Sequence, residues 1–89
     1  MRIGQALLET KLAACVHVTG PIDSIFRWKD KVEHSQEWLC TIKTRAALYK
    51  KCEATILTLH PYETPEIVAM RIEKTTAAYA AWLRAETRR

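Results

Sequence analysis

A short segment past the middle of the chain carries the side chains best suited to chemistry. It reads His60-Pro61-Tyr62-Glu63-Thr64-Pro65-Glu66 and places an imidazole, a phenol and two carboxyl groups close together. Its two prolines restrict the backbone more than a simple connection requires. Imidazole and carboxylate groups bind borderline cations such as copper and zinc, so His60, Tyr62 and Glu66 are candidate site residues. The alternative is a structural turn, in which Glu66 accepts backbone hydrogen bonds and His60 caps the preceding helix.

The cysteines offer a weaker combination. Cys15 and His17 are two residues apart in an expected strand, so their side chains share one face, which is compatible with a pair of metal ligands. Two ligands do not define a selective site, and a cysteine in an apolar segment is usually a packing residue. Cys40 and Cys52 lie on apolar faces without a neighbouring base, and we expect both in the core. An odd number of cysteines without a CxxC spacing predicts no disulfide framework.

The sequence carries no signature of catalysis. It has no GxSxG, no HExxH, no phosphate-cradling glycine loop and no paired catalytic carboxylates, and only two glycines. We therefore expect no enzyme. The net charge of +4 comes from 14 basic and 10 acidic residues, and the basic residues are interleaved with acidic or apolar ones. A solvated surface explains this pattern, so we expect no nucleic-acid partner.

Length and composition predict one domain over residues 1–89. With 48% hydrophobic residues, the chain can form one core but not two independent ones. A chain of this size buries only about 60–65% of its unfolded surface, so self-association would supplement its stability. Glu9 and Lys11 fall where a signal peptide needs an unbroken apolar stretch, and no apolar run is long enough to span a membrane. Together with the unpaired cysteines, this predicts a cytoplasmic protein without membrane contact.

Hydrophobic periodicity predicts three helices around a long hairpin. The expected order is a helix over residues 3–12, a strand over 13–28 bent at Gly20, a turn at 29–31, a strand over 38–44, a helix over 48–59 ended by His60-Pro61, a strand at 68–72 and a helix capped by Thr75 or Thr76. Trp28 and Trp38 are expected to flank the hairpin turn, where only an interface would cover such large apolar groups.

Three segments, taken together, resemble the divalent-cation tolerance (CutA) family. They are Leu12-Ala13-Ala14-Cys15-Val16, Ser24-Ile25-Phe26-Arg27-Trp28-Lys29 and His60-Pro61-Tyr62-Glu63-Thr64-Pro65-Glu66-Ile67. Lys43-Thr44, Tyr79 and Trp82 extend the resemblance over nearly the whole chain. It implies an α+β fold, a ferredoxin-like α/β sandwich with an antiparallel sheet and an added C-terminal helix, and homotrimers formed through extended hairpins. Asp30 replaces the glycine usual in the family's hairpin turn, and Asp tolerates the required backbone.

The chain also departs from the family pattern, because the first strand and its loop have no counterpart. In the ferredoxin-like order this strand lies centrally, between the strands carrying residues 39–42 and 68–72. Three explanations are open: an incomplete chain, direct pairing of the two neighbouring strands, or a strand supplied by another chain. We expect that a native strand is missing.

The resemblance implies a metal-tolerance or metal-responsive trimer that binds divalent ions of the copper or zinc type, with no metal required for folding. Leu59 stands where some relatives have a second histidine, so His60 is the one imidazole at the matching position. Binding there is expected to be weak and to be completed by Glu66, Tyr62 or a neighbouring subunit. The alternative is a small-ligand signalling trimer with clefts between subunits lined by Lys43, Tyr62 and Glu66.

Overall fold

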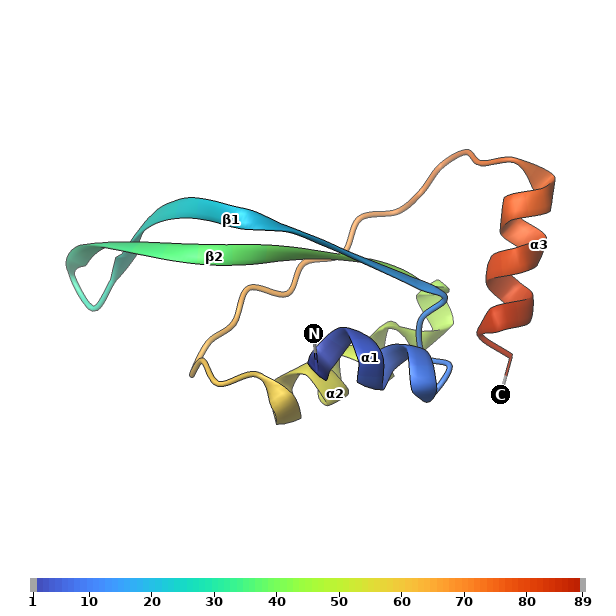
Figure 1. Ribbon diagram of the computed structural model, residues 1–89, viewed down its shortest axis with the longest axis horizontal. Helices are drawn as coiled ribbons and strands as arrows, with labels where there is room; N and C mark the ends of the chain where they lie inside the picture. Colours follow the sequence, from blue (N-terminus) through green and yellow to red (C-terminus); the bar gives the residue numbers. More distant parts are fainter. Residues whose placement is uncertain (1, 89) are drawn as a thin grey trace.

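The computed structural model describes residues 2–88 and is elongated, with extents of 45 × 26 × 20 Å. Its elements are α1 (Arg2–Glu9), β1 (Cys15–Trp28), β2 (Lys31–Lys43), the 3-10 helix η1 (Ala46–Leu48), α2 (Tyr49–Leu59) and α3 (Ala77–Glu86). α1 and α2 lie side by side near the base of the hairpin, and the hairpin arm (residues 20–38) extends away from them (Figure 1). Within residues 2–88, no helix is long and apolar enough to cross a membrane.

β1 and β2 form an antiparallel hairpin whose pairing is continuous except between Thr19 and Ile22. Gly20 lies at this irregularity, and a Cβ atom there would come within 2.6 Å of the Trp38 ring. The predicted bend at Gly20 is therefore confirmed. Only glycine leaves room for the Trp38 indole where the ladder is interrupted.

The hairpin turn consists of Lys29 and Asp30, with φ angles of 50° and 67°. Two consecutive residues in the left-handed region form the backbone of a type I′ turn, whose twist matches that of the strands. The prediction that Asp30 tolerates the turn is confirmed. Lys29 adopts the same conformation, and its Nζ lies 5.7 Å from the Trp28 ring centroid.

The core lies between α1, the turn that follows it, η1 and α2, which together we call the helical layer. Its buried side chains are Leu7, Leu12, Ala13, Leu48, Cys52 and Ile56. α1 packs closely on β1, because a Cβ atom at Gly4 would lie 3.0 Å from Cγ1 of Val16. Ile42 and Ile67 also pack against this cluster, so the base of β2 and the chain after α2 both meet the same core.

α1 ends at Glu9, before the predicted residue 12. Lys11 has a φ of 59°, which interrupts the helix. The backbone N–H groups of Leu12 and Ala13 then both donate to the Leu7 carbonyl, at 2.9 and 3.1 Å. This arrangement satisfies the last turn of the helix and directs the chain into β1.

The other two helices have the predicted ends. α2 ends at Leu59, directly before His60-Pro61. Thr76 caps α3 by accepting a hydrogen bond from the Tyr79 backbone N–H at 3.2 Å. Both ends follow from local chemistry, because proline disfavours helix in the residue before it and threonine is a preferred N-cap.

The strand predicted at residues 68–72 does not form. Residues 65–76 have no regular structure, and within residues 2–88 the sheet has two strands. A strand needs hydrogen bonds to a neighbour, and the direct pairing with β2 left open by the sequence does not occur. Val68 and Met70 are instead 72% and 90% exposed. The α+β class is confirmed, whereas the ferredoxin-like sheet stays a prediction.

Two residues lie elsewhere than predicted. Trp28 adjoins the turn, but Trp38 lies beside Gly20 on the other face of the hairpin, so it does not flank the turn. Pairing begins directly at Lys31, which puts Trp38 more than halfway along β2. Cys40 is exposed and not in the core, because the helical layer covers the hairpin base at Ile42 and reaches no further along that face.

Candidate metal-binding groove

The segment His60–Glu66 leaves the C-terminus of α2 and turns beneath the hairpin (Figure 1). The His60 backbone N–H donates to the Ile56 carbonyl at 2.8 Å, which closes the last turn of α2. Its imidazole is held by the next residues: the Tyr62 backbone N–H donates to Nδ1 at 3.1 Å, and the two ring centroids are 4.7 Å apart. Because Nδ1 accepts this bond, a neutral ring carries its proton on Nε2, so neither ring nitrogen offers a free lone pair to a ligand in this arrangement.

A groove of about 840 Å³ lies between this segment and the hairpin arm. His60, Tyr62 and Glu66 all line it, so the structure brings these sequence-predicted residues together. Trp38 lines the hairpin side and adds a large apolar surface. The structural-turn interpretation also holds in part, because the His60 side chain orders its own turn. The observed His60 bonds are compatible with both interpretations.

The charged groups lining the groove are all acidic. They are Glu33, Glu37, Glu63 and Glu66, accompanied by His34 and His60, and no Lys or Arg is among the lining residues. Four of the ten acidic residues thus gather in one groove of a protein with 14 basic ones. Clefts lined by one sign of charge raise the local concentration of the opposite ion. The acidic lining of the groove therefore favours cations over anions.

The groove does not hold a complete set of metal ligands. Among residues 2–88, no three His, Cys, Asp or Glu side chains are placed to bind one ion. Lys43 does not line the groove: it lies at the end of β2, opposite Cys15. One chain alone therefore does not bring Lys43 to Tyr62 and Glu66, and the predicted cleft between subunits remains a prediction.

Three groove residues on β2 were missed as site residues by the sequence interpretation. Glu33, His34 and Glu37 lie on the arm, and their place opposite the His60 segment follows from tertiary structure. Their only local signal is a concentration of acidic and imidazole groups within one strand, which a solvated strand also shows.

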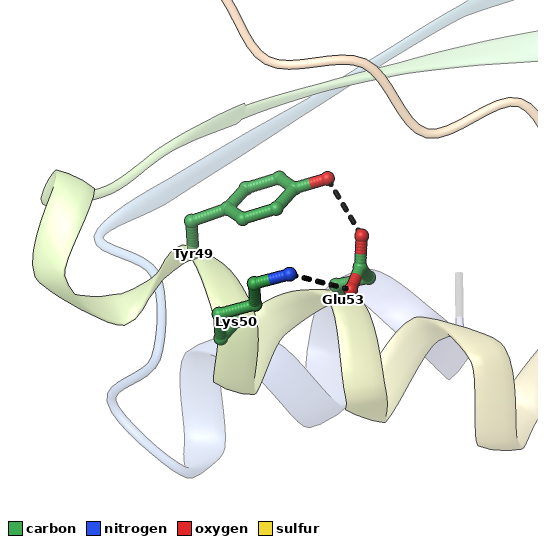
Figure 2. A network of polar contacts seen from close by, with 3 residues as sticks. All are labelled: Tyr49, Lys50 and Glu53. Atoms are coloured by element: carbon green, nitrogen blue, oxygen red, sulfur yellow. Dashed lines mark hydrogen bonds and ion pairs between the residues drawn. The ribbon is translucent and has the colours of Figure 1, made fainter.

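A second polar cluster lies on α2, outside the groove. The Tyr49 hydroxyl donates to Oε2 of Glu53 at 2.8 Å, and the Lys50 ammonium is 3.9 Å from Oε1 of the same carboxylate (Figure 2). The hydrogen bond to Glu53 raises the pKa of Tyr49, with smaller contributions from desolvation and the carboxylate charge. Glu53 is engaged on the helix surface and does not face the candidate site.

Cys52 is a core residue, as predicted. It is buried, and its thiol donates to the Leu12 carbonyl at 3.3 Å. Burial raises the pKa of the Cys52 thiol, and a hydrogen bond with Thr44 lowers it by less. A thiol with a raised pKa is a poor nucleophile and a poor metal ligand at neutral pH, so Cys52 is excluded from the candidate site.

Comparisons with known proteins agree over almost the whole chain. The model of the CutA1 divalent ion tolerance protein family matches residues 1–86. This chain belongs to the CutA1 family. The divalent-cation tolerance protein CutA of Thermus thermophilus is 41% identical over 85 residues, which are 96% of this chain and 82% of that protein. Human Protein CutA is 38% identical over 96% of this chain, which spans about half (48%) of its length.

Solved CutA1 structures share the fold. The Thermus thermophilus structure gives a TM-score of 0.93 at 41% identity, and the match covers 97% of this chain and 84% of the Thermus thermophilus chain. The Oryza sativa CutA1 structure gives a TM-score of 0.94 at 34% identity, and the match covers 98% of this chain and 80% of the Oryza sativa chain. CutA1 relatives carry different compartments in their names: one from Archaeoglobus fulgidus is described as periplasmic and one from Arabidopsis thaliana as chloroplastic. Membership of the family therefore leaves the predicted cytoplasmic location a prediction.

Proposed function

We propose that this CutA1 family member is a homotrimeric binding protein that takes up divalent copper or zinc in the groove and catalyses no reaction. One observation carries the proposal: the groove gathers four glutamates and two histidines and has no basic lining residue. The names of its relatives, which refer to divalent-cation tolerance, support the same class of ligand.

His60 is the proposed anchor, because imidazole suits copper and zinc better than carboxylate alone does. Its Nε2 must present a lone pair to the ion, so the ring proton must sit on Nδ1. Nδ1 then can no longer accept the Tyr62 backbone N–H, which it does now at 3.1 Å. Binding is thereby coupled to a rearrangement of the segment His60–Glu66, and Glu66 on the same segment would supply a carboxylate.

Assembly is the second part of the proposal. The strand register puts Ile22, Phe26, Trp28 and Leu39 on the sheet face opposite Val16 and Ile42, which face the helical layer. All four are more than a third exposed, and exposed apolar groups gathered on one face are usually covered by another subunit. The same four residues line the groove, so a subunit that covers this face would also border the groove. Three copies are proposed from the family resemblance. Light scattering should give a trimer mass, and a mass near the 10.2 kDa of one chain would contradict the assembly.

Calorimetric titration with Cu²⁺ and Zn²⁺ tests the site. His60→Ala should weaken copper binding at least tenfold, because it removes the imidazole anchor. Cys52→Ser is the matched control, since its thiol lies in the core, and it should leave the affinity unchanged. In the wild-type protein, the Tyr62 amide resonance should shift on metal addition. Equal affinities for wild type and His60→Ala would remove His60 from the site.

A small-ligand function is the alternative that the groove also supports. Trp38 and Tyr62 supply aromatic surface to the groove, and aromatic side chains with a few polar groups are typical of ligand sites. In a trimer, Lys43 of a neighbouring copy would complete such a cleft. Thermal shifts separate the two functions: stabilisation by divalent metals and not by a metabolite collection favours metal binding.

A further inference from the structure

We propose that Cys15 and His17 form a second metal site, separate from the groove, that binds a soft monovalent cation such as the cuprous ion. The two side chains project from the same face of β1, and Sγ of Cys15 lies 3.6 Å from Nε2 of His17. The proposal does not depend on the function proposed for the groove.

The 3.6 Å separation of the two atoms matches two ligands of a tetrahedral ion, and a linear two-coordinate ion requires the two side chains to move apart. With metal–sulfur and metal–nitrogen bonds of about 2.3 and 2.0–2.1 Å, a sulfur and a nitrogen on one ion lie roughly 3.6 Å apart at a tetrahedral angle and roughly 4.3 Å apart in a line. His17 is exposed, so a small rotation of its ring covers the range between these two values.

The backbone under the pair is fixed by the hairpin. Cys15 pairs with Lys43 and His17 with Thr41 on β2, and the Ala14 backbone N–H donates to the Lys43 carbonyl at 3.0 Å. The two ligands are therefore held by the ladder at the base of the sheet, near the core. A site on regular structure of this kind keeps its geometry better than one on a loop.

The ligand set selects the type of ion. Within residues 2–88 no third His, Cys, Asp or Glu joins the pair, and the cross-strand neighbours Lys43 and Thr41 are not soft ligands. Zinc in structural sites needs four ligands, so this pair does not suit it. The cuprous ion is stable with two ligands, thiolate is the soft ligand that selects it, and imidazole also suits copper. Cys15 is partly exposed in the single chain, and the strand register places it on the same sheet face as Leu39, so in an assembled protein the ion would bind next to the neighbouring subunit.

A thiol–imidazole hydrogen bond would give the same 3.6 Å distance, so the experiment must separate the two. Cys40 provides the matched control, because it is an exposed thiol on the same hairpin that lies opposite Val18 and not beside a histidine on its strand. If any free surface thiol could bind the ion, Cys40→Ser would weaken binding as much as Cys15→Ser does.

The test is anaerobic titration of the full chain with Cu(I), kept reduced by ascorbate, in competition with the chelator bicinchoninate. We expect one Cu(I) per chain, at least tenfold weaker binding in Cys15→Ser and in His17→Asn, and no change in Cys40→Ser or His60→Ala. X-ray absorption should show one sulfur and one nitrogen around copper, with the nitrogen lost in His17→Asn. Circular dichroism confirms that the variants are folded.

The opposite results overturn the proposal. An unchanged Cu(I) affinity in His17→Asn would mean that the 3.6 Å contact is only a thiol–imidazole hydrogen bond. Equal losses of affinity in Cys15→Ser and Cys40→Ser would mean that surface thiols in general bind the ion. A loss in His60→Ala would place the Cu(I) in the groove. Failure of the groove proposal is seen separately, with Cu²⁺ or Zn²⁺ and His60→Ala.

Discussion

In the helical layer the apolar side chains on the facing sides of α1 and α2 are buried against one another, whereas in the hairpin arm the large apolar side chains are exposed. Leu7 is 0% exposed at the centre of the layer, while Ile25 and Trp38 on the arm are 65% and 62% exposed. No residue of β1 or β2 belongs to the buried cluster. The layer therefore stabilises itself by burial, and the arm holds its shape by strand pairing and is suited to meeting other surfaces.

The chain after α2 shows both behaviours. Ile67 packs against the core cluster, but the residues that follow it leave the layer, and Met70 is 90% exposed. The change occurs within a few residues and coincides with the absence of a strand partner. Burial in this molecule therefore depends on contact with the helical layer more than on the hydrophobicity of a segment.

The largest effect is expected from a cavity in the helical layer. Leu7→Ala should lower the free energy of unfolding by about 2–5 kcal/mol, because a fully buried leucine loses its contacts. Trp38→Ala should change it by less than about 1 kcal/mol in dilute, dissociated protein, because its side chain is largely exposed there.

Urea unfolding at two protein concentrations measures both changes. If the interface extends around the arm to the face that carries Trp38, opposite that of Phe26 and Trp28, Trp38→Ala should cost about 3–5 kcal/mol only at the concentration where the protein is assembled. A large, concentration-independent loss in Trp38→Ala would show that the arm, too, has its own core, and the contrast between the regions would be lost.

A smaller effect is expected at the attachment of α3. Thr87 is fully buried, and Arg45 donates to its hydroxyl at 2.9 Å and to its carbonyl at 2.8 Å. Arg45→Ala leaves these acceptors without their charged donor and should cost about 1–3 kcal/mol. In Arg45→Ala, hydrogen exchange should become faster relative to wild type in α3, and by less in α2. Arg84→Ala, on the same helix, is the control, and matching exchange in both variants would mean that Arg45 does not hold α3.

Local features of this fold could be predicted from the sequence, and non-local ones could not. The end of α2 at Leu59, the Thr76 cap and the bend at Gly20 each depend on chemistry within a few residues. Pairing of residues 68–72 depends on a distant neighbour, and the contact between Arg45 and Thr87 spans 42 residues. In the site, His60, Tyr62 and Glu66 were found because they are close in sequence. Glu33 and Glu37 were missed because the tertiary fold brings them to the groove.

The hairpin turn should be improvable by a modest amount. Asp30 has a φ of 67°, and glycine adopts this conformation without the Cβ penalty of about 1 kcal/mol. Asp30→Gly should therefore stabilise the hairpin by up to about 1 kcal/mol, less the entropy that glycine loses on folding. Thermal unfolding measures the gain, and Asp23→Gly, within β1, is the control and should destabilise. A lower melting temperature for Asp30→Gly would mean that the aspartate side chain itself supports the turn.

The smallest expected effect concerns the Cys52 thiol and alkaline pH. Burial raises its pKa above the usual 9.0 in the folded protein, so the unfolded chain loses the thiol proton first as the pH rises. The contribution of the protonated Cys52 thiol to the free energy of unfolding is complete below pH 9. It is lost as the pH rises through the folded-state pKa, so unfolding becomes easier in alkali. Cys52→Ala should flatten this decline relative to wild type, while Tyr49→Phe controls for the raised pKa of Tyr49.

In the native protein, Ellman's reagent should label Cys40 rapidly and Cys52 only on unfolding, because one thiol is exposed and the other is buried in the helical layer. Rapid native labelling of Cys52 would show that the layer opens readily, and it would remove the contrast with the arm.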